Sequence, residues 1–164
     1  MKIIFTLLLS SLLVSCGIYS FTGASIPTEA KTISVKYFNN KAATVQPALS
    51  QVFTERLKDM FLEQTNLTLS ENEGDLAFSG YISKYQIKPM AIKANETAGK
   101  NRLTIAIKVK YSNRFNAENN FENTFSRYRD YDSSQNISDI EDTLIEEITN
   151  ELAEDVFNKA FVNW

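Results

Sequence analysis

Apolar and polar residues alternate most regularly along residues 103–111. The apolar positions of this segment are Leu103, Ile105, Ile107, Val109 and Tyr111. The polar and charged positions around it are Arg102, Thr104, Lys108, Lys110 and Arg114. A period of two places each set on its own face of a strand, so we predict a half-buried strand here.

Three further segments have the composition and alternation of strands: residues 32–38, 76–87 and 121–131. The alternation of the second is imperfect around Gly80, which indicates a bulge at that residue. Residues 67–69 fit either the end of a helix-to-strand connection or a short strand. The pattern therefore predicts four main strands.

Two other segments repeat their apolar residues with helical spacing. The first opens at Pro47, which suits the first turn of a helix, and runs to about Gln64. The second opens with Ser138 and Glu141, the serine–glutamate spacing of a capping box. The first stripe consists of Leu49, Val52, Phe53, Leu57, Met60 and Phe61. The second consists of Ile140, Leu144, Ile145, Ile148, Leu152, Val156 and Phe157.

The predicted order is strand, helix, strand, strand, strand, helix. The last three strands follow one another closely, which favours antiparallel pairing. Each helix has one apolar stripe to bury, and one face of the sheet can cover both. We therefore predict a single α+β domain over residues 31–164, a two-layer sandwich with two helices on one face of a mainly antiparallel four-stranded sheet.

The start of the chain has the layout of an export signal. Lys2 is followed by an apolar stretch over residues 3–14 and then by Cys16, which is the only cysteine. This arrangement is typical of a bacterial lipobox, in which cleavage leaves an acylated cysteine at the mature N-terminus. We predict that residues 1–15 are removed and that residues 16–30 form a lipid-anchored tether.

Two other interpretations of this segment are a plain signal peptide with a chance cysteine and an N-terminal membrane helix. The apolar stretch is shorter than the roughly 20 residues that a spanning helix needs, which favours the lipoprotein. Several acyl chains on Cys16 would hold the domain stably at a membrane outside the cytoplasm.

The composition argues against several kinds of catalytic and metal-binding site. The chain contains no histidine, so it has neither the usual zinc ligand nor the commonest general base. The single cysteine allows no disulfide within the chain. The acidic residues show no calcium-loop spacing, and no glycine-rich phosphate loop occurs among the five glycines. We expect a protein that is not an enzyme and that holds no metal or cofactor.

The charge is unevenly distributed within a net charge of −3. Residues 84–114 hold eight basic residues against one acidic residue, whereas residues 115–164 hold twelve acidic residues against three basic ones. A cationic segment in an acidic chain suggests a localised anionic partner. The alternative is an ordinary solvated strand face, because lysines often protect exposed strands. Nucleic acid is not expected as the partner of an exported protein.

Several segments resemble the LptE family of lipopolysaccharide-assembly lipoproteins, in the form found in Bacteroidota. The matching segments are CGIYSFTG (16–23), TISV (32–35), PALS (47–50), NRLTI (101–105), FSRY (125–128) and EDVFN (154–158). The resemblance implies two helices on a four-stranded sheet. It also implies an outer-membrane lipoprotein, facing the periplasm, that assists assembly of the barrel LptD, plugs it and supports lipopolysaccharide insertion into the outer leaflet.

The resemblance also implies that lipopolysaccharide binds basic residues near the strand loops. Charge alone selects the candidates here, which are Lys88, Lys93, Lys100, Arg102 and Arg127. The alternative function is a free lipid-binding or carrier lipoprotein, which would not require a stable complex with a barrel.

Overall fold

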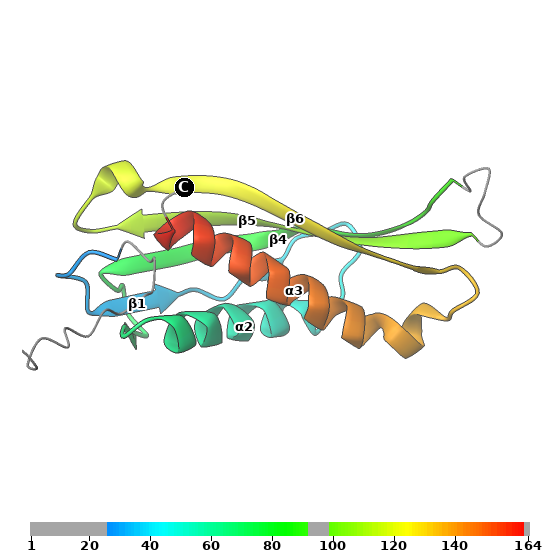
Figure 1. Ribbon diagram of the computed structural model, residues 1–164, viewed down its shortest axis with the longest axis horizontal. Helices are drawn as coiled ribbons and strands as arrows, with labels where there is room; N and C mark the ends of the chain where they lie inside the picture. Colours follow the sequence, from blue (N-terminus) through cyan, green and yellow to red (C-terminus); the bar gives the residue numbers. More distant parts are fainter. Residues whose placement is uncertain (1–25, 92–98, 163–164) are drawn as a thin grey trace, which may run out of the picture.

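The structure is a computed structural model that describes residues 26–91 and 99–162. Two helices lie side by side against one face of a long, curved sheet (Figure 1). The helices are α2 (Leu49–Gln64) and α3 (Ile137–Phe161). The strands are β1 (Thr32–Val35), β2 (Asn39–Asn40), β3 (Thr68–Leu69), β4 (Leu76–Pro89), β5 (Lys100–Asn113) and β6 (Phe121–Asp132). A 3-10 turn, η2 (Ala117–Asn119), joins β5 to β6.

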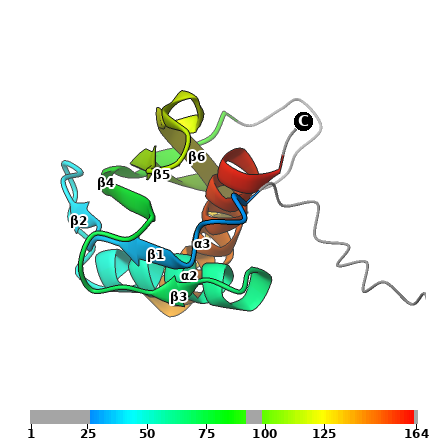
Figure 2. The same cartoon turned by 90° about the vertical axis from the view of Figure 1, so that its left-hand side faces the viewer.

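The α+β sandwich is confirmed, but the sheet is larger and more mixed than predicted. Its order in the described part of the chain is β3-β1-β4-β5-β6, with β2 also paired to β4. The long β4–β5 and β5–β6 pairings are antiparallel, whereas β1 runs parallel to both β3 and β4. Figure 2 shows β1 and β3, at the parallel edge of the sheet, beside α2. The prediction of four strands is therefore too simple.

The predicted first strand, residues 32–38, is divided into β1 and β2. Between them the buried Phe38 turns its backbone away from the sheet, and its N–H donates to the hydroxyl of Thr54 on α2 (3.1 Å). The chain returns to the sheet at Asn39, where β2 pairs with β4. A side chain on the helix layer thus competes successfully with the sheet ladder for this donor.

The bulge in β4 lies between Ile82 and Lys84, where the register with β5 shifts, and not at Gly80 as predicted. Gly80 serves another purpose. A Cβ atom at this position would lie 1.9 Å from the Lys108 carbonyl oxygen and 2.6 Å from the Phe38 ring. Glycine is therefore required here because two neighbours approach its backbone closely.

The interface between the sheet and the helices is filled by the predicted apolar sets. All five apolar positions of residues 103–111 are at most 1% exposed. Aromatic rings from four elements meet at one end of this core. The ring centroid of Phe61 on α2 lies 4.5 Å from that of Phe78 on β4 and 5.7 Å from that of Phe161 on α3, and Tyr111 on β5 lies 4.7 Å from Phe78.

The last helix begins earlier than the predicted capping box. Asn136 is the N-cap, and its side chain accepts a hydrogen bond from the Ser138 N–H (3.3 Å). Ser138 therefore lies inside the first turn, and the capping-box prediction is wrong. Glu141 instead accepts a hydrogen bond from the Tyr85 hydroxyl, which joins α3 to β4.

The predictions for Cys16 and for the rest of residues 1–25 lie outside the described residues. No helix in the described ranges has both the length and the apolar character needed to cross a membrane.

Candidate functional site

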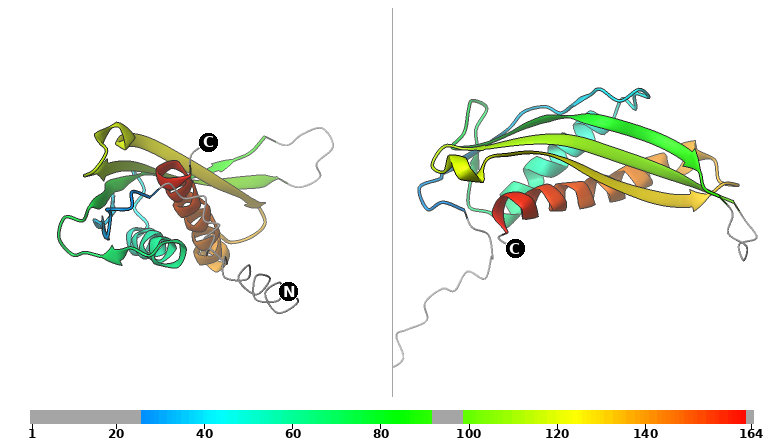
Figure 3. Two further views of the ribbon diagram at one scale, coloured as in Figure 1. Left: turned by 60° about the vertical axis from the view of Figure 1, so that its left-hand side comes forward. Right: turned by 90° about the horizontal axis from the view of Figure 1, so that it is seen from above.

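Both helices pack against the same face of the sheet, so in the described part of the chain no helix covers the opposite face. The right-hand view of Figure 3 shows β4, β5 and β6 running across this face with the helices behind them. Alternation along β5 sends its apolar side chains toward the helices and its basic side chains outward. We call this outward surface the open face. Its basic residues among those described include Lys41, Lys84, Lys88, Lys100, Arg102, Lys108 and Lys110.

The bulge between Ile82 and Lys84 changes which residues of β4 reach the open face. After it, Lys88 lies opposite Arg102 on β5, and Lys100 lies two residues before Arg102 on the same strand. The structure therefore brings three of the five candidate residues together at one end of the open face. The fourth, Lys93, lies outside the described residues.

Arg102 is the most constrained of these candidates. Its Nε and Nη2 groups donate to the two carboxylate oxygens of Asp130 on β6 (2.6 and 2.8 Å). Its guanidinium lies 3.7 Å from the ring centroid of Tyr128. The hydrogen bonds from Arg102 lower the pKa of the Asp130 carboxyl below its ordinary value. Lys88 and Lys100, by contrast, have no carboxylate oxygen of a described residue within 4 Å of Nζ. Lys100 lies opposite Asp132 on β6, and its positive charge helps to lower the pKa of both Asp130 and Asp132.

Arg127 lies on the other side of the sheet. It pairs with Ile105, whose side chain faces the helices, and its guanidinium donates to both carboxylate oxygens of Asp155 on α3 (2.6 Å each). This bidentate contact raises the pKa of Arg127 and fixes β6 against α3. The structure therefore separates Arg127 from Lys88, Lys100 and Arg102.

Arg129, two residues further along β6, makes the same kind of contact. It donates to Glu147 (2.7 Å) and Glu151 (2.5 Å) of α3. These hydrogen bonds raise the pKa of Arg129, and the one from Arg129 is the main cause that lowers the pKa of Glu151. Two arginines of β6 thus hold the acidic side of the last helix.

No group of three or more histidine, cysteine or acidic side chains among the described residues could hold a metal ion. The chemistry that the open face offers is recognition by charge and hydrogen bonding, with lysines, one held arginine and hydroxyl side chains. Three acidic residues of β6, Glu122, Asp130 and Asp132, share this face and lie opposite its basic residues.

Comparison with protein families decides what kind of chain this is. Residues 30–160 match the model of the family described as LptE, lipopolysaccharide-assembly. The chain belongs to the LptE family. The match extends from just before β1 to the last turn of α3, so it covers the whole two-layer domain of this LptE-family chain.

Solved structures show the same fold. A minor lipoprotein from Acinetobacter baumannii is 16% identical with a TM-score of 0.51, over 79% of this chain and 91% of that one. A putative neuraminyllactose-binding hemagglutinin homolog from Helicobacter pylori is 10% identical with a TM-score of 0.52, over 86% and 88%. A hypothetical protein from Chlamydia trachomatis is 8% identical with a TM-score of 0.50, over 82% and 99%. No curated protein matches the chain in sequence.

One basic residue of the open face, Lys41, was missed by sequence reasoning. Lys41 lies outside the cationic segment, yet β2 brings it beside β4, where its Nζ lies 4.7 Å from the ring centroid of Tyr81. No signal in the sequence joins these two residues, because their proximity depends on the parallel β2–β4 pairing. The open face of this LptE-family domain therefore also carries a cationic group beside the middle of β4.

Proposed function

We propose that the protein is an outer-membrane lipoprotein that assists assembly of the barrel LptD, plugs it and supports insertion of lipopolysaccharide into the outer leaflet. The observation that carries this proposal is the family match across residues 30–160. The predicted lipid on Cys16 supports it, because that anchor would hold the domain at a membrane without a spanning helix.

The packing supports a plug more than a free lipid carrier. A carrier must enclose acyl chains in an apolar cavity. In the described residues, buried apolar side chains fill the space between sheet and helices, with the rings of Phe61, Phe78, Tyr111 and Phe161 at one end. A domain with a filled core offers its outer surfaces to a partner, which is what a plug requires.

The first test is depletion of the protein in its native cell. We expect the amount of correctly assembled barrel to fall and lipopolysaccharide to fail to reach the outer leaflet. Barrel maturation is measured by gel mobility of the folded form, and surface lipopolysaccharide by labelling of intact cells. The purified protein is expected to bring down the barrel in stoichiometric amount. Normal barrel assembly after depletion would overturn the proposal.

The open face is proposed to bind the phosphates of lipopolysaccharide through Lys88 and Lys100, with Lys93 as a further candidate. Charge-assisted hydrogen bonds to phosphate are stronger than neutral ones and, where exposed, weaken with salt. Replacing both Lys88 and Lys100 by glutamate is expected to lower the affinity for purified lipopolysaccharide by about tenfold, or ~1.4 kcal/mol. Binding is measured at two salt concentrations.

The matched control reverses Lys31 and Lys159, two exposed lysines away from the open face. It changes the net charge by the same amount and is expected to leave binding nearly unchanged. Arg102 is left intact because an acidic residue there would face Asp130. Equal losses in both double variants would show that only overall charge matters.

A further inference from the structure

The strand β1 has a complete partner on one side and an incomplete one on the other. On its inner side it pairs with β4 from Ile33 to Val35, and the next residue, Lys36, donates its N–H to the Phe78 carbonyl oxygen (2.9 Å). On its outer side the pairing with β3 covers only Thr32 and Ile33. The last outer bond runs from the Ser70 N–H to the Ile33 carbonyl oxygen (2.8 Å).

The alternation of backbone groups along β1 gives the direction in which the Val35 N–H points. The Ile33 carbonyl points outward and the Lys36 N–H points inward. Backbone groups of successive residues alternate in direction, so the Val35 N–H points outward. Because β3 ends at Leu69, this N–H has no strand partner in the described part of the chain. Such an unpaired edge is a template for another extended segment.

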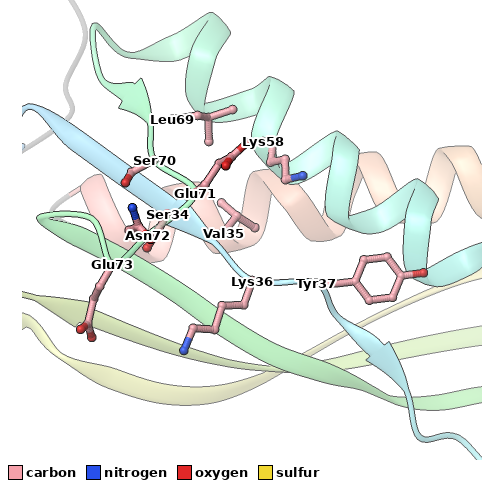
Figure 4. A pocket seen from close by; sticks show the side chains of 10 residues that line it. All are labelled: Ser34, Val35, Lys36, Tyr37, Lys58, Leu69, Ser70, Glu71, Asn72 and Glu73. Atoms are coloured by element: carbon pink, nitrogen blue, oxygen red, sulfur yellow. The ribbon is translucent and has the colours of Figure 1, made fainter.

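A groove of about 730 Å³ lies beside this free edge. Figure 4 shows β1 and its continuation on one side of it, residues 69–73 on another, and Lys58 of α2 reaching in from the helix layer. Val35 and Leu69 are half-buried, and Tyr37 is 52% exposed, which is unusual for a large aromatic side chain. The lining holds two basic and two acidic residues and so has no net charge: Lys36, Lys58, Glu71 and Glu73. Lys58 also donates to Glu55 on the same helix (2.9 Å).

We propose that this groove binds an extended, uncharged segment of a protein partner, which adds to the sheet beside Val35 where β3 stops. Main-chain hydrogen bonds to the free edge supply the binding, and side chains of the segment contact Val35, Leu69 and Tyr37. The balanced lining selects against a strongly charged segment. The identity of the partner as the barrel rests on the proposed function, whereas the free edge and the groove do not.

Hydrogen–deuterium exchange resolved to single amides tests the proposal. The lipidated full-length protein in detergent is compared with its purified complex with the barrel. The Val35 amide is expected to exchange at least tenfold more slowly in the complex than in the free protein. The neighbouring Lys36 amide is the internal control, because its bond to Phe78 protects it in both states.

Site-specific photo-crosslinking provides a second readout. A benzoylphenylalanine at position 37 replaces an exposed aromatic with another of similar shape. The matched control carries it at Phe115, which is 44% exposed and lies in the β5–η2 connection. We expect adducts with one contiguous segment of the barrel chain from position 37, at several times the yield of position 115.

The two proposals fail in different ways. If no barrel complex can be isolated, both the proposed function and the barrel as the occupant of the groove are overturned. If the complex forms but the Val35 amide exchanges as fast as before, only the groove proposal is wrong. Equal adduct yields from positions 37 and 115 would also overturn it. Slowed exchange in the free protein at rising concentration would instead identify a second copy of this chain as the occupant and exclude the barrel.

Discussion

Replacing Phe61 with alanine is expected to lower the free energy of unfolding by about 3–5 kcal/mol. Phe61 is fully buried on α2. Its ring lies within 4.5–6.2 Å, between centroids, of Phe78, Phe157 and Phe161. Removal of the ring withdraws apolar surface from the core and leaves a cavity that three rigid neighbours cannot close. Chemical denaturation followed by circular dichroism measures the change.

The adjacent Leu62 is the matched control, because it is 47% exposed on the same helix. Its replacement by alanine is expected to change stability by no more than about 0.5 kcal/mol, as surface substitutions usually do. Similar losses in both variants would mean that α2 does not bury the face described here. The sequence stripe already predicts this difference, since Phe61 belongs to the apolar set and Leu62 does not.

The second large effect is expected at Gly80. An alanine Cβ would lie 1.9 Å from the backbone carbonyl oxygen of Lys108 and 2.6 Å from the Phe38 ring. A backbone atom cannot rotate away, so β4 and β5 must separate or shift. We expect Gly80→Ala to cost about 3 kcal/mol, the upper part of the range for overpacked sites, measured as a fall in the denaturation midpoint.

Gly99 provides the comparison for Gly80. The nearest atom to a Cβ there is the Ser133 hydroxyl at 3.1 Å, the end of a side chain that can rotate. Gly99→Ala is therefore expected to leave stability almost unchanged. If Gly80→Ala were equally mild, the close β4–β5 approach described here would be incorrect.

The sequence predicts most of the buried layer because burial and alternation are local properties of it. The five apolar positions of residues 103–111 face the helices as predicted, and the helix stripes point at the sheet. The exceptions are Val52 and Ile140, which are only half-buried. A periodic pattern predicts the buried residues correctly where a helix or strand packs only one of its faces against the core.

The errors occur where a tertiary contact overrides the local pattern. Phe38 interrupts the first strand because Thr54, sixteen residues later, offers its hydroxyl. The bulge at Ile82–Lys84 and the role of Gly80 both depend on the partner strand. Neither feature has a reliable signature within its own segment.

The candidate site was only partly predictable for the same reason. Lys88, Lys100 and Arg102 share a face because of strand parity and one bulge. Arg127 has the same charge, but its side chain points to the opposite face of the sheet, where its guanidinium donates to Asp155 on α3. A count of charges along the chain gives no direction for the side chains, and so it groups residues that the fold separates.

The parallel pairing of β1 has a consequence for the order in which the domain folds. The β4–β5–β6 meander joins strands that are neighbours in sequence, whereas Asp75, immediately before β4, accepts a hydrogen bond from the Thr32 N–H of β1 across 43 residues. Closing that long loop carries a larger entropic cost, so the meander is expected to form first. During synthesis β1 emerges before β4, so β1 must stay extended and unpaired until β4 is available, which is the period when a chaperone would have most to protect.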